Sequence, residues 1–118
     1  MTEEERLQAA SMRYIRLQYP GAVSFHVANE RQTSPARGAK LKKLGVLKGV
    51  ADILILEPSP QGFHGLAIEL KSKKGKIQPS QELFLSRIGA RGYYTTVCRS
   101  FDEVQKVCDQ YFSGTIPM

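Results

Sequence analysis

Two carboxylates and a lysine stand in apolar stretches of the chain. Asp52 precedes the apolar residues 53–56, and Glu69 and Lys71 end the apolar segment 65–71. A turn with two prolines and a glycine, residues 58–62, separates the two segments. If the segments pair as antiparallel strands, Asp52 and Glu69 lie near the same end of a hairpin, where opposed Cβ atoms are about 4.5–5.5 Å apart.

Carboxylates at this separation repel each other unless one is protonated or a cation lies between them. A hard divalent ion such as Mg²⁺ takes oxygen ligands at about 2.1 Å and keeps several waters, which suits a pair of carboxylates. Such an ion binds a phosphate oxygen, activates water and stabilises the leaving oxygen. Lys71 shares a strand face with Glu69, so it can orient that water or neutralise developing charge. The three residues therefore indicate metal-assisted hydrolysis of phosphodiesters.

The same residues also have a structural interpretation. An alternating Glu-Leu-Lys is typical of an edge strand that faces solvent, where Glu69 and Lys71 are ordinary surface charges. Asp52 can likewise cap the turn that enters its strand. The acid on a predicted partner strand, together with lysine-rich segments nearby, favours the chemical interpretation.

The elements predicted around these residues follow the order α-β-β-β-α-β-α. Helices are expected at 3–18, at 79–90 and after Ser100, and strands at 22–28, 53–56, 65–71 and 93–98. Thr2 and Ser100 are the expected N-caps. Residues 29–48 are expected to be irregular, with at most a helical turn at 40–47. This order indicates an α/β fold at the border of α+β, with a mixed sheet flanked by helices in one domain over residues 1–118.

Basic residues gather in two segments next to the predicted site. The net charge is +6, and neither residues 31–48, with six lysines and arginines, nor residues 71–76, with four lysines, contain an acid. Segregated charge of this kind indicates a surface that faces a polyanion, with nucleic acid as the leading candidate. A solvated basic face without a partner is the alternative. The expected nucleic-acid contacts are Arg37, Lys40, Lys42, Lys43, Lys48, Lys73, Lys74 and Lys76.

Composition argues against several other classes of protein. Cys98 and Cys108 belong to no CxxC motif or Cys/His cluster, so a zinc site is not expected and the thiols fit a cytoplasmic protein. No apolar run approaches the roughly 20 residues that span a bilayer, and the acidic N-terminus is not expected to be a signal peptide. Neither a membrane nor a small-molecule cofactor is an expected partner.

The two histidines are assigned no catalytic role. His26 alternates with Val23, Phe25 and Val27, which are expected to be buried, so His26 should face the other side of its strand and serve the structure. His64 lies in or beside the predicted turn and is expected to be solvated.

The segments GVADILIL and GLAIELKSKKGKIQPSQELFLSRIGARGYYTTVCRSFDEV resemble the VRR-NUC (virus-type replication-repair nuclease) domain of the PD-(D/E)xK nuclease superfamily. The resemblance extends over nearly the whole chain and includes HVANE at 26–30 and the G-x-I-x-P-S-Q run at 75–81. It implies a restriction-endonuclease-like core, which agrees with the predicted order of elements. Ala51 is a small departure, because the family commonly has proline before the aspartate.

The resemblance implies a role for each residue of the motif. Asp52 and Glu69 match the acidic metal ligands, and Lys71 matches the catalytic lysine. The backbone carbonyl of Leu70 is expected to complete the metal shell. Gln81 matches a glutamine that supports the site.

Two further acidic positions follow from the resemblance. A glutamate in the first helix often contributes to the metal site, and Glu5 is chosen over Glu4. Asn29 and Glu30 match a family feature near the site, with no role assigned to them.

The resulting expectation is a Mg²⁺-dependent deoxyribonuclease, with Mn²⁺ as a substitute metal. The expected substrate is branched DNA such as four-way junctions or flaps, cut by a structure-selective endonuclease that acts as a homodimer. The expected location is the cytoplasm of a bacterial or phage-infected cell. The alternative is a non-catalytic basic module for DNA binding or assembly, in which the acids are structural. The decisive feature is the strand register, which must place Asp52 beside Glu69 for the nuclease interpretation to hold.

Overall fold

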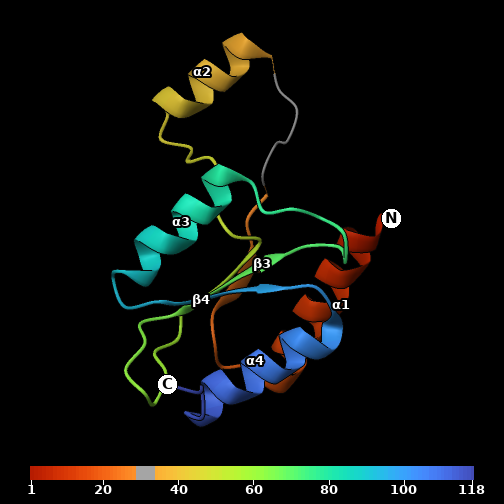
Figure 1. The fold of residues 1–118 in the computed structure, drawn as a ribbon, viewed down its shortest axis with the longest axis vertical. Coiled ribbons are helices and arrows are strands. Elements are labelled where there is room, and N and C mark those ends of the chain that lie inside the picture. Colours follow the sequence, from red (N-terminus) through yellow and green to blue (C-terminus); the bar gives the residue numbers. More distant parts are fainter. Residues whose placement is uncertain (29–33) are drawn as a thin grey trace.

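The computed structural model of the chain describes residues 1–28 and 34–118. Within these residues, four strands form one mixed sheet in the order β1-β2-β3-β4. The strands are β1 (Ser24–His26), β2 (Ile53–Ile55), β3 (Leu66–Leu70) and β4 (Tyr94–Cys98). Strands β1, β2 and β3 are antiparallel neighbours, whereas β4 runs parallel to β3. The helices are α1 (Glu3–Gln18), α2 (Pro35–Lys43), α3 (Pro79–Gly89) and α4 (Phe101–Ser113), which gives an α+β fold (Figure 1).

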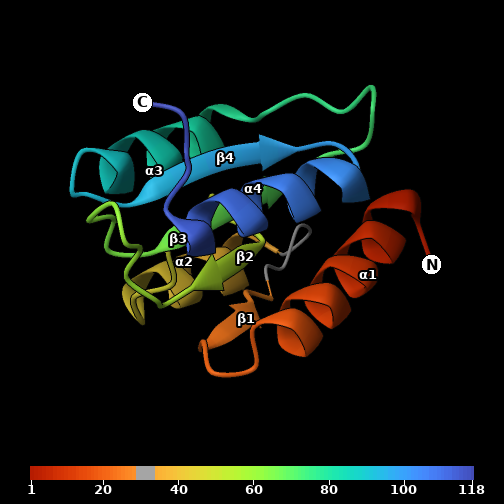
Figure 2. The ribbon, with the colours of Figure 1, turned by 90° about the horizontal axis from the view of Figure 1, so that it is seen from below.

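The hydrophobic core lies between the sheet and a layer formed by α1 and α4, which pack side by side (Figure 2). Its fully buried members come from α1, from alternate strand positions and from α4: Ile15, Ile53, Ile55, Leu66, Ile68, Leu70, Val104, Cys108 and Tyr111. Helix α3 packs against β4 away from this layer (Figure 1). Because side chains alternate along a strand, Ala67 and Glu69 point to the opposite face of the sheet from the core.

The register of β2 and β3 confirms the prediction on which the site depended. Ile53 pairs with Ile68 and Leu54 with Ala67. Extending this antiparallel register by one residue places Asp52 opposite Glu69. The edge-strand interpretation is wrong, because β3 lies between two strands and all five of its residues are buried.

Helix α2 is the main difference from the expected order of elements. A helical turn at most was expected at 40–47, but the helix begins at Pro35 and has nine residues. Its start has two favourable signals, since the Ser34 hydroxyl accepts a hydrogen bond from the Arg37 N–H at 3.1 Å and Pro35 lies in the first turn. The sequence pattern did not predict this helix, because the segment contains Gly38 and has no regular apolar stripe. The caps predicted at Thr2 and Ser100 are confirmed.

Strand β1 is shorter than predicted, and at its start the buried residue is not the one that was predicted. Val23 was expected to be buried but is 60% exposed, whereas Ser24 is buried. The strand lies at the edge of the sheet and packs against α1. The predicted burial of Val23, Phe25 and Val27 therefore fails at Val23, and Phe25 and Val27 are only partly buried.

The described residues contain no helix that is both long and apolar enough to cross a membrane. Cys98 and Cys108 are free and lie in the core. Burial raises the pKa of each thiol to about 12, so both thiols stay protonated at neutral pH.

Candidate active site

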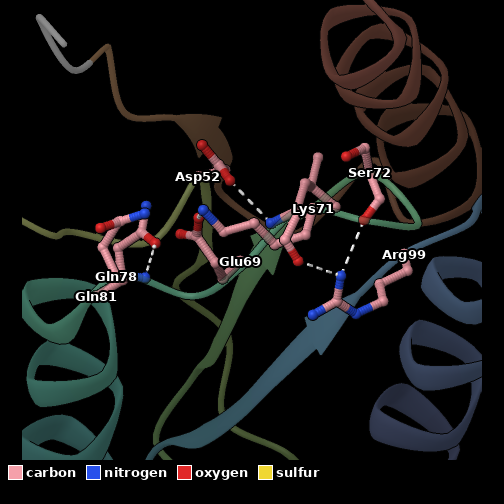
Figure 3. A network of polar contacts seen from close by, with 9 residues as sticks. Asp52, Glu69, Lys71, Ser72, Gln78, Gln81 and Arg99 are labelled. Atoms are coloured by element: carbon pink, nitrogen blue, oxygen red, sulfur yellow. Dashed lines mark hydrogen bonds and ion pairs between the residues drawn. The ribbon is translucent and has the colours of Figure 1, made fainter.

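Three segments of the chain meet at the end of β3 (Figure 3). They are residues 49–52 before β2, residues 69–71 and the first turn of α3. Gly49 brings the first segment against the third, since a Cβ at this position would overlap the carbonyl group of Ser80 and lie 2.9 Å from the Gln81 nitrogen. Gly49 also has a φ of +90°, a backbone angle that residues other than glycine rarely adopt. Glycine therefore allows the segment that carries Asp52 to close on α3.

Asp52 is held from both neighbouring strands. Its Oδ2 accepts a hydrogen bond from the Leu70 N–H at 2.8 Å. Its carbonyl oxygen accepts from the Val27 N–H at 3.0 Å and lies 2.7 Å from Nδ1 of His26. Because a carbonyl oxygen only accepts, Nδ1 of His26 must carry the proton. His26 thus fixes the backbone of a site residue, in agreement with the structural role predicted for it.

Glu69 and Lys71 are buried together beside Asp52. Glu69 is 1% exposed and Lys71 is 6% exposed. The Lys71 Nζ lies 3.7 Å from Oε2 of Glu69. The Lys71 N–H donates to the Cys98 carbonyl at 3.0 Å, which continues the pairing with β4 and keeps Lys71 on the same face as Glu69. Charges that are removed from water interact more strongly than surface charges, so this pair differs from an ordinary surface ion pair.

The backbone of Leu70 lies on the Asp52 side of β3. In a strand, the N–H and C=O of one residue point to the same neighbour. Since the Leu70 N–H donates to Asp52, the Leu70 carbonyl also faces the segment that carries Asp52. This direction suits the role that was predicted for the carbonyl, which remains a prediction.

Gln81 is the third residue of α3, and part of its side chain is used to start the helix. Its Oε1 accepts a hydrogen bond from the Gln78 N–H at 2.9 Å. The NH₂ of Gln81 is a donor group that this bond leaves available to a substrate or water. Figure 3 shows Gln81 on the Glu69 side of β3, away from Arg99.

The structure does not bring Glu5 to the carboxylate pair. Its Oε1 accepts from the Thr2 N–H at 2.8 Å and forms a capping box at the start of α1. Helix α1 covers the core face of the sheet, whereas Glu69 points to the other face. In the part of the chain that the structure describes, no group of three or more His, Cys, Asp or Glu side chains could hold a metal ion. The predicted positions Asn29 and Glu30 lie outside the described residues.

The donor set that remains fits a hard metal ion. Asp52 and Glu69 supply carboxylate oxygens on adjoining strand positions, and the Leu70 carbonyl faces the same side. Mg²⁺ typically takes one or two carboxylates and fills its other positions with water and substrate phosphate. Within residues 1–28 and 34–118, two carboxylates and one backbone carbonyl face this side, a set that leaves room for the water and phosphate ligands a Mg²⁺ ion requires.

The predicted nucleic-acid contacts lie on two exposed segments. Arg37, Lys40, Lys42 and Lys43 are exposed on α2, and Lys48 is exposed in the segment that leads to Asp52. Helix α2 has no buried residue and stands apart from the sheet in Figure 1. Lys73, Lys74 and Lys76 are exposed in the loop that follows Lys71.

Sequence reasoning missed Arg99, which follows β4. Its Nη1 donates to the carbonyls of Ser72 at 2.9 Å and Gly75 at 2.6 Å, in the turn directly after Lys71 (Figure 3). Both partners are backbone atoms, which leave no side-chain pattern in the sequence. No signal in the sequence marked this contact.

Asp52, directly before β2, and Glu69 and Lys71, at the end of β3, thus meet at one end of a mixed sheet in an α+β domain. The VRR-NUC domain family matches residues 2–102. The chain therefore belongs to the VRR-NUC domain family, which is part of a nuclease superfamily.

Two solved structures are similar to this chain. A VRR_NUC domain protein has a TM-score of 0.77 at 24% sequence identity, over 96% of this chain and 90% of that chain. A VRR_NUC domain has a TM-score of 0.60 at 23% identity, over 95% of this chain and 100% of that chain. At these identities the two structures establish the fold. No match was found among the curated proteins.

Proposed function

We propose that this chain is a Mg²⁺-dependent deoxyribonuclease that hydrolyses phosphodiester bonds, with Mn²⁺ as a substitute metal. One observation carries the proposal. The strand register pairs Ile53 with Ile68, the neighbours of Asp52 and Glu69, and the Lys71 Nζ lies 3.7 Å from the Glu69 carboxylate. Membership of a nuclease superfamily supports the same conclusion.

Asp52, Glu69 and the Leu70 carbonyl would hold the metal ion. When bound, the ion supplies Lewis-acid activation of the phosphate and of a water molecule. The Leu70 N–H fixes one oxygen of Asp52, so the carboxylate is oriented before any ligand arrives. Lys71 presents its ammonium beside Glu69, where it can orient the attacking water or offset charge on the phosphate. The Gln81 NH₂ is a further donor for substrate or water.

The exposed basic segments would grip the DNA backbone. The lysines of α2 and those of the 72–76 loop belong to segments that flank residues 49–52 and 69–71 in the chain. Contacts from lysine to phosphate carry affinity without sequence preference. This favours a substrate that is selected by shape, and we propose branched DNA such as four-way junctions or flaps.

A homodimer would place two such sites on one substrate. The segment after α2 exposes three apolar side chains, Leu44, Val46 and Leu47, and α3 exposes Leu83. Leu47 also lines a hollow together with Phe84 and Ile88 of α3. Exposed apolar side chains beside such a hollow are typical of protein–protein contacts. Sedimentation of the wild type and of Leu47→Asp tests this point, since a monomeric wild type at micromolar concentration would contradict the dimer.

The proposed function is tested by cleavage of a panel of labelled DNA substrates: linear duplex, 5′ flap, 3′ flap and four-way junction. The wild type should cut in Mg²⁺ or Mn²⁺ and be inactive in EDTA, with branched substrates cut fastest. The non-catalytic alternative predicts DNA binding that EDTA does not change and no hydrolysis in Mn²⁺. Uncut substrates across the panel, with folded protein shown by circular dichroism, would overturn the nuclease proposal.

A further inference from the structure

Arg99 fixes the turn that comes directly after Lys71. Its Nη1 donates to the carbonyls of both Ser72 and Gly75, at 2.9 and 2.6 Å (Figure 3). The turn is also closed by the Gly75 N–H, which donates to the Ser72 carbonyl at 3.1 Å. Hydrogen bonds from a charged donor are stronger than those between neutral groups. One guanidinium therefore holds the two ends of residues 72–75 together.

This turn lies close to the side chain of Lys71. A Cβ on Gly75 would lie 3.6 Å from Cδ of Lys71 and 3.0 Å from Oγ of Ser72. A methyl group at Gly75 would thus be in van der Waals contact with the aliphatic part of the lysine. Lys71 is 6% exposed although it follows the last residue of β3. A lysine side chain loses much rotamer freedom when it is fixed, so the turn beside it matters for where its ammonium lies.

Arg99 is also tied to the next element. Its backbone N–H donates to Oε1 of Glu103 in the first turn of α4, at 2.8 Å. The guanidinium of Arg99 donates to carbonyl groups of the protein itself. In contrast, the side chains of Lys73 and Lys74 are exposed to solvent. Arg99 therefore connects α4 and β4 to the turn beside Lys71.

We infer that Arg99 is a positioning residue for Lys71. By fixing the turn of residues 72–75, it holds the lysine side chain in place with its ammonium at the Glu69 carboxylate. The inference rests on the proposed function, in which Lys71 acts at the phosphate. A misplacement of about 1 Å in a catalytic group can cost a hundredfold in rate, so the loss of Arg99 should lower kcat while DNA affinity stays unchanged.

The first test compares Arg99→Gln with Arg13→Gln, which removes the same charge from an exposed position on α1. Arg99→Gln should lower kcat by about 10- to 100-fold. Its KM for DNA should differ from the wild-type KM by no more than the KM of Arg13→Gln does. Arg99→Lys keeps the charge and a donor group and should recover part of the rate, and it serves as the test variant if Arg99→Gln does not fold. Equal kcat in the Arg99 and Arg13 variants, or a change in KM alone, would overturn the inference.

The second test asks whether Arg99 acts through Lys71. In a Lys71→Met background, Arg99→Gln should cost less than threefold in rate, because the two substitutions remove the same contribution. A full additional loss in that background would contradict the inference.

A third measurement needs no nuclease activity. The reaction of Lys71 with an amine-reactive reagent, followed by mass spectrometry, should become severalfold faster in Arg99→Gln, while labelling of Lys106 stays constant. If the wild type cuts no DNA, unchanged labelling of Lys71 overturns the role of Arg99, whereas faster labelling retains it and places the failure in the proposed function.

Discussion

Asp52 has two separate properties, a hydrogen-bond acceptor and a negative charge, and they predict different consequences. The acceptor holds the Leu70 N–H at 2.8 Å, which stabilises the fold. The charge lies next to the Ile53–Ile68 pair, across from Glu69, and the single positive charge of Lys71 offsets only part of the repulsion between the two carboxylates. Site residues of this kind often reduce stability for the sake of function.

Substitutions at Asp52 should separate the two properties. Asp52→Asn keeps the acceptor, so in EDTA its melting temperature should equal or exceed that of the wild type. Asp52→Ala leaves the Leu70 N–H without this acceptor and should lose about 1–3 kcal/mol of unfolding free energy. The rate of DNA cleavage should fall by about 100-fold or more in both variants. Urea unfolding in EDTA measures the stability, and an asparagine variant as unstable as the alanine variant would contradict this division.

At the level of single residues, the sequence predicted which side chains of the two neighbouring strands lie close together. Asp52, Glu69 and Lys71 were found because acids in apolar strands are conspicuous, and the register brings two of them together. Glu5 lies in the capping box of α1 and not with the carboxylate pair. The sequence could not show this, because Glu3, Glu4 and Glu5 all suit the start of a helix. Arg99 could not be found, since its partners are carbonyl groups.

At the level of elements, the approach of residues 49–52 to α3 depends on glycine. Gly49 and Gly45 both have positive φ, at 90° and 101°. A Cβ on Gly49 would overlap the Ser80 carbonyl, whereas a Cβ on Gly45 would meet nothing within 4 Å. Alanine substitutions at the two positions can therefore be compared, since both carry the cost of backbone strain but only the one at Gly49 adds a steric clash.

Gly45→Ala should cost about 1 kcal/mol of unfolding free energy from backbone strain alone. Gly49→Ala should cost a further 1–3 kcal/mol or so, because the clash is with backbone that cannot rotate away. It should also lower cleavage, since the shift moves Asp52 relative to α3. Chemical denaturation of the two variants gives the comparison, and equal stability would show that the close approach of Gly49 and Ser80 contributes nothing.

Helix α2 offers a separate prediction about binding. Lys40 and Lys43 lie in its last turn, where basic residues also suit the helix dipole. If they contact phosphates, Lys40→Gln with Lys43→Gln should reduce the slope of log Kd against log salt by about 2, with kcat at saturating DNA unchanged. The double variant Arg13→Gln with Lys106→Gln, which removes two exposed charges elsewhere, is the control. Equal salt slopes for the two double variants would leave the basic face of α2 as a solvated surface.

The order of elements was predicted well where apolar periodicity is strong. Helices α1, α3 and α4 and strands β2, β3 and β4 agree with the predicted segments to within a few residues at each boundary. Helix α2 and strand β1 were predicted poorly. The first has no buried side chain to impose a pattern, and the second is a three-residue edge strand.

At the level of the whole molecule, the core responds to alkaline pH. Burial raises the pKa of Cys98, Cys108 and Tyr111 to about 12. In the unfolded chain the thiols ionise near pH 9 and the phenol near pH 10. Above these values the unfolded chain binds fewer protons than the folded protein, so stability is complete below about pH 8.5 and falls as pH rises toward 12.

The expected loss is about 1 kcal/mol for each thiol at pH 10. Cys98→Ala and Cys108→Ala should each flatten the fall in melting temperature between pH 8 and 10, even though each lowers stability at all pH values by leaving a small cavity. Scanning fluorimetry across pH 7–10.5 measures the slopes. A wild-type melting temperature that does not change over this range would contradict the prediction.

The central claim is that Asp52 and Glu69 hold a divalent ion that the reaction requires. The most direct measurement is the single-turnover rate of DNA cleavage against Mg²⁺ concentration for the wild type and Asp52→Asn, both shown to be folded. The wild-type rate should rise from zero in EDTA to saturation, and the variant should stay at least about 100-fold slower at every concentration. Cleavage by the wild type in EDTA, or equal rates for the two proteins, would contradict the claim.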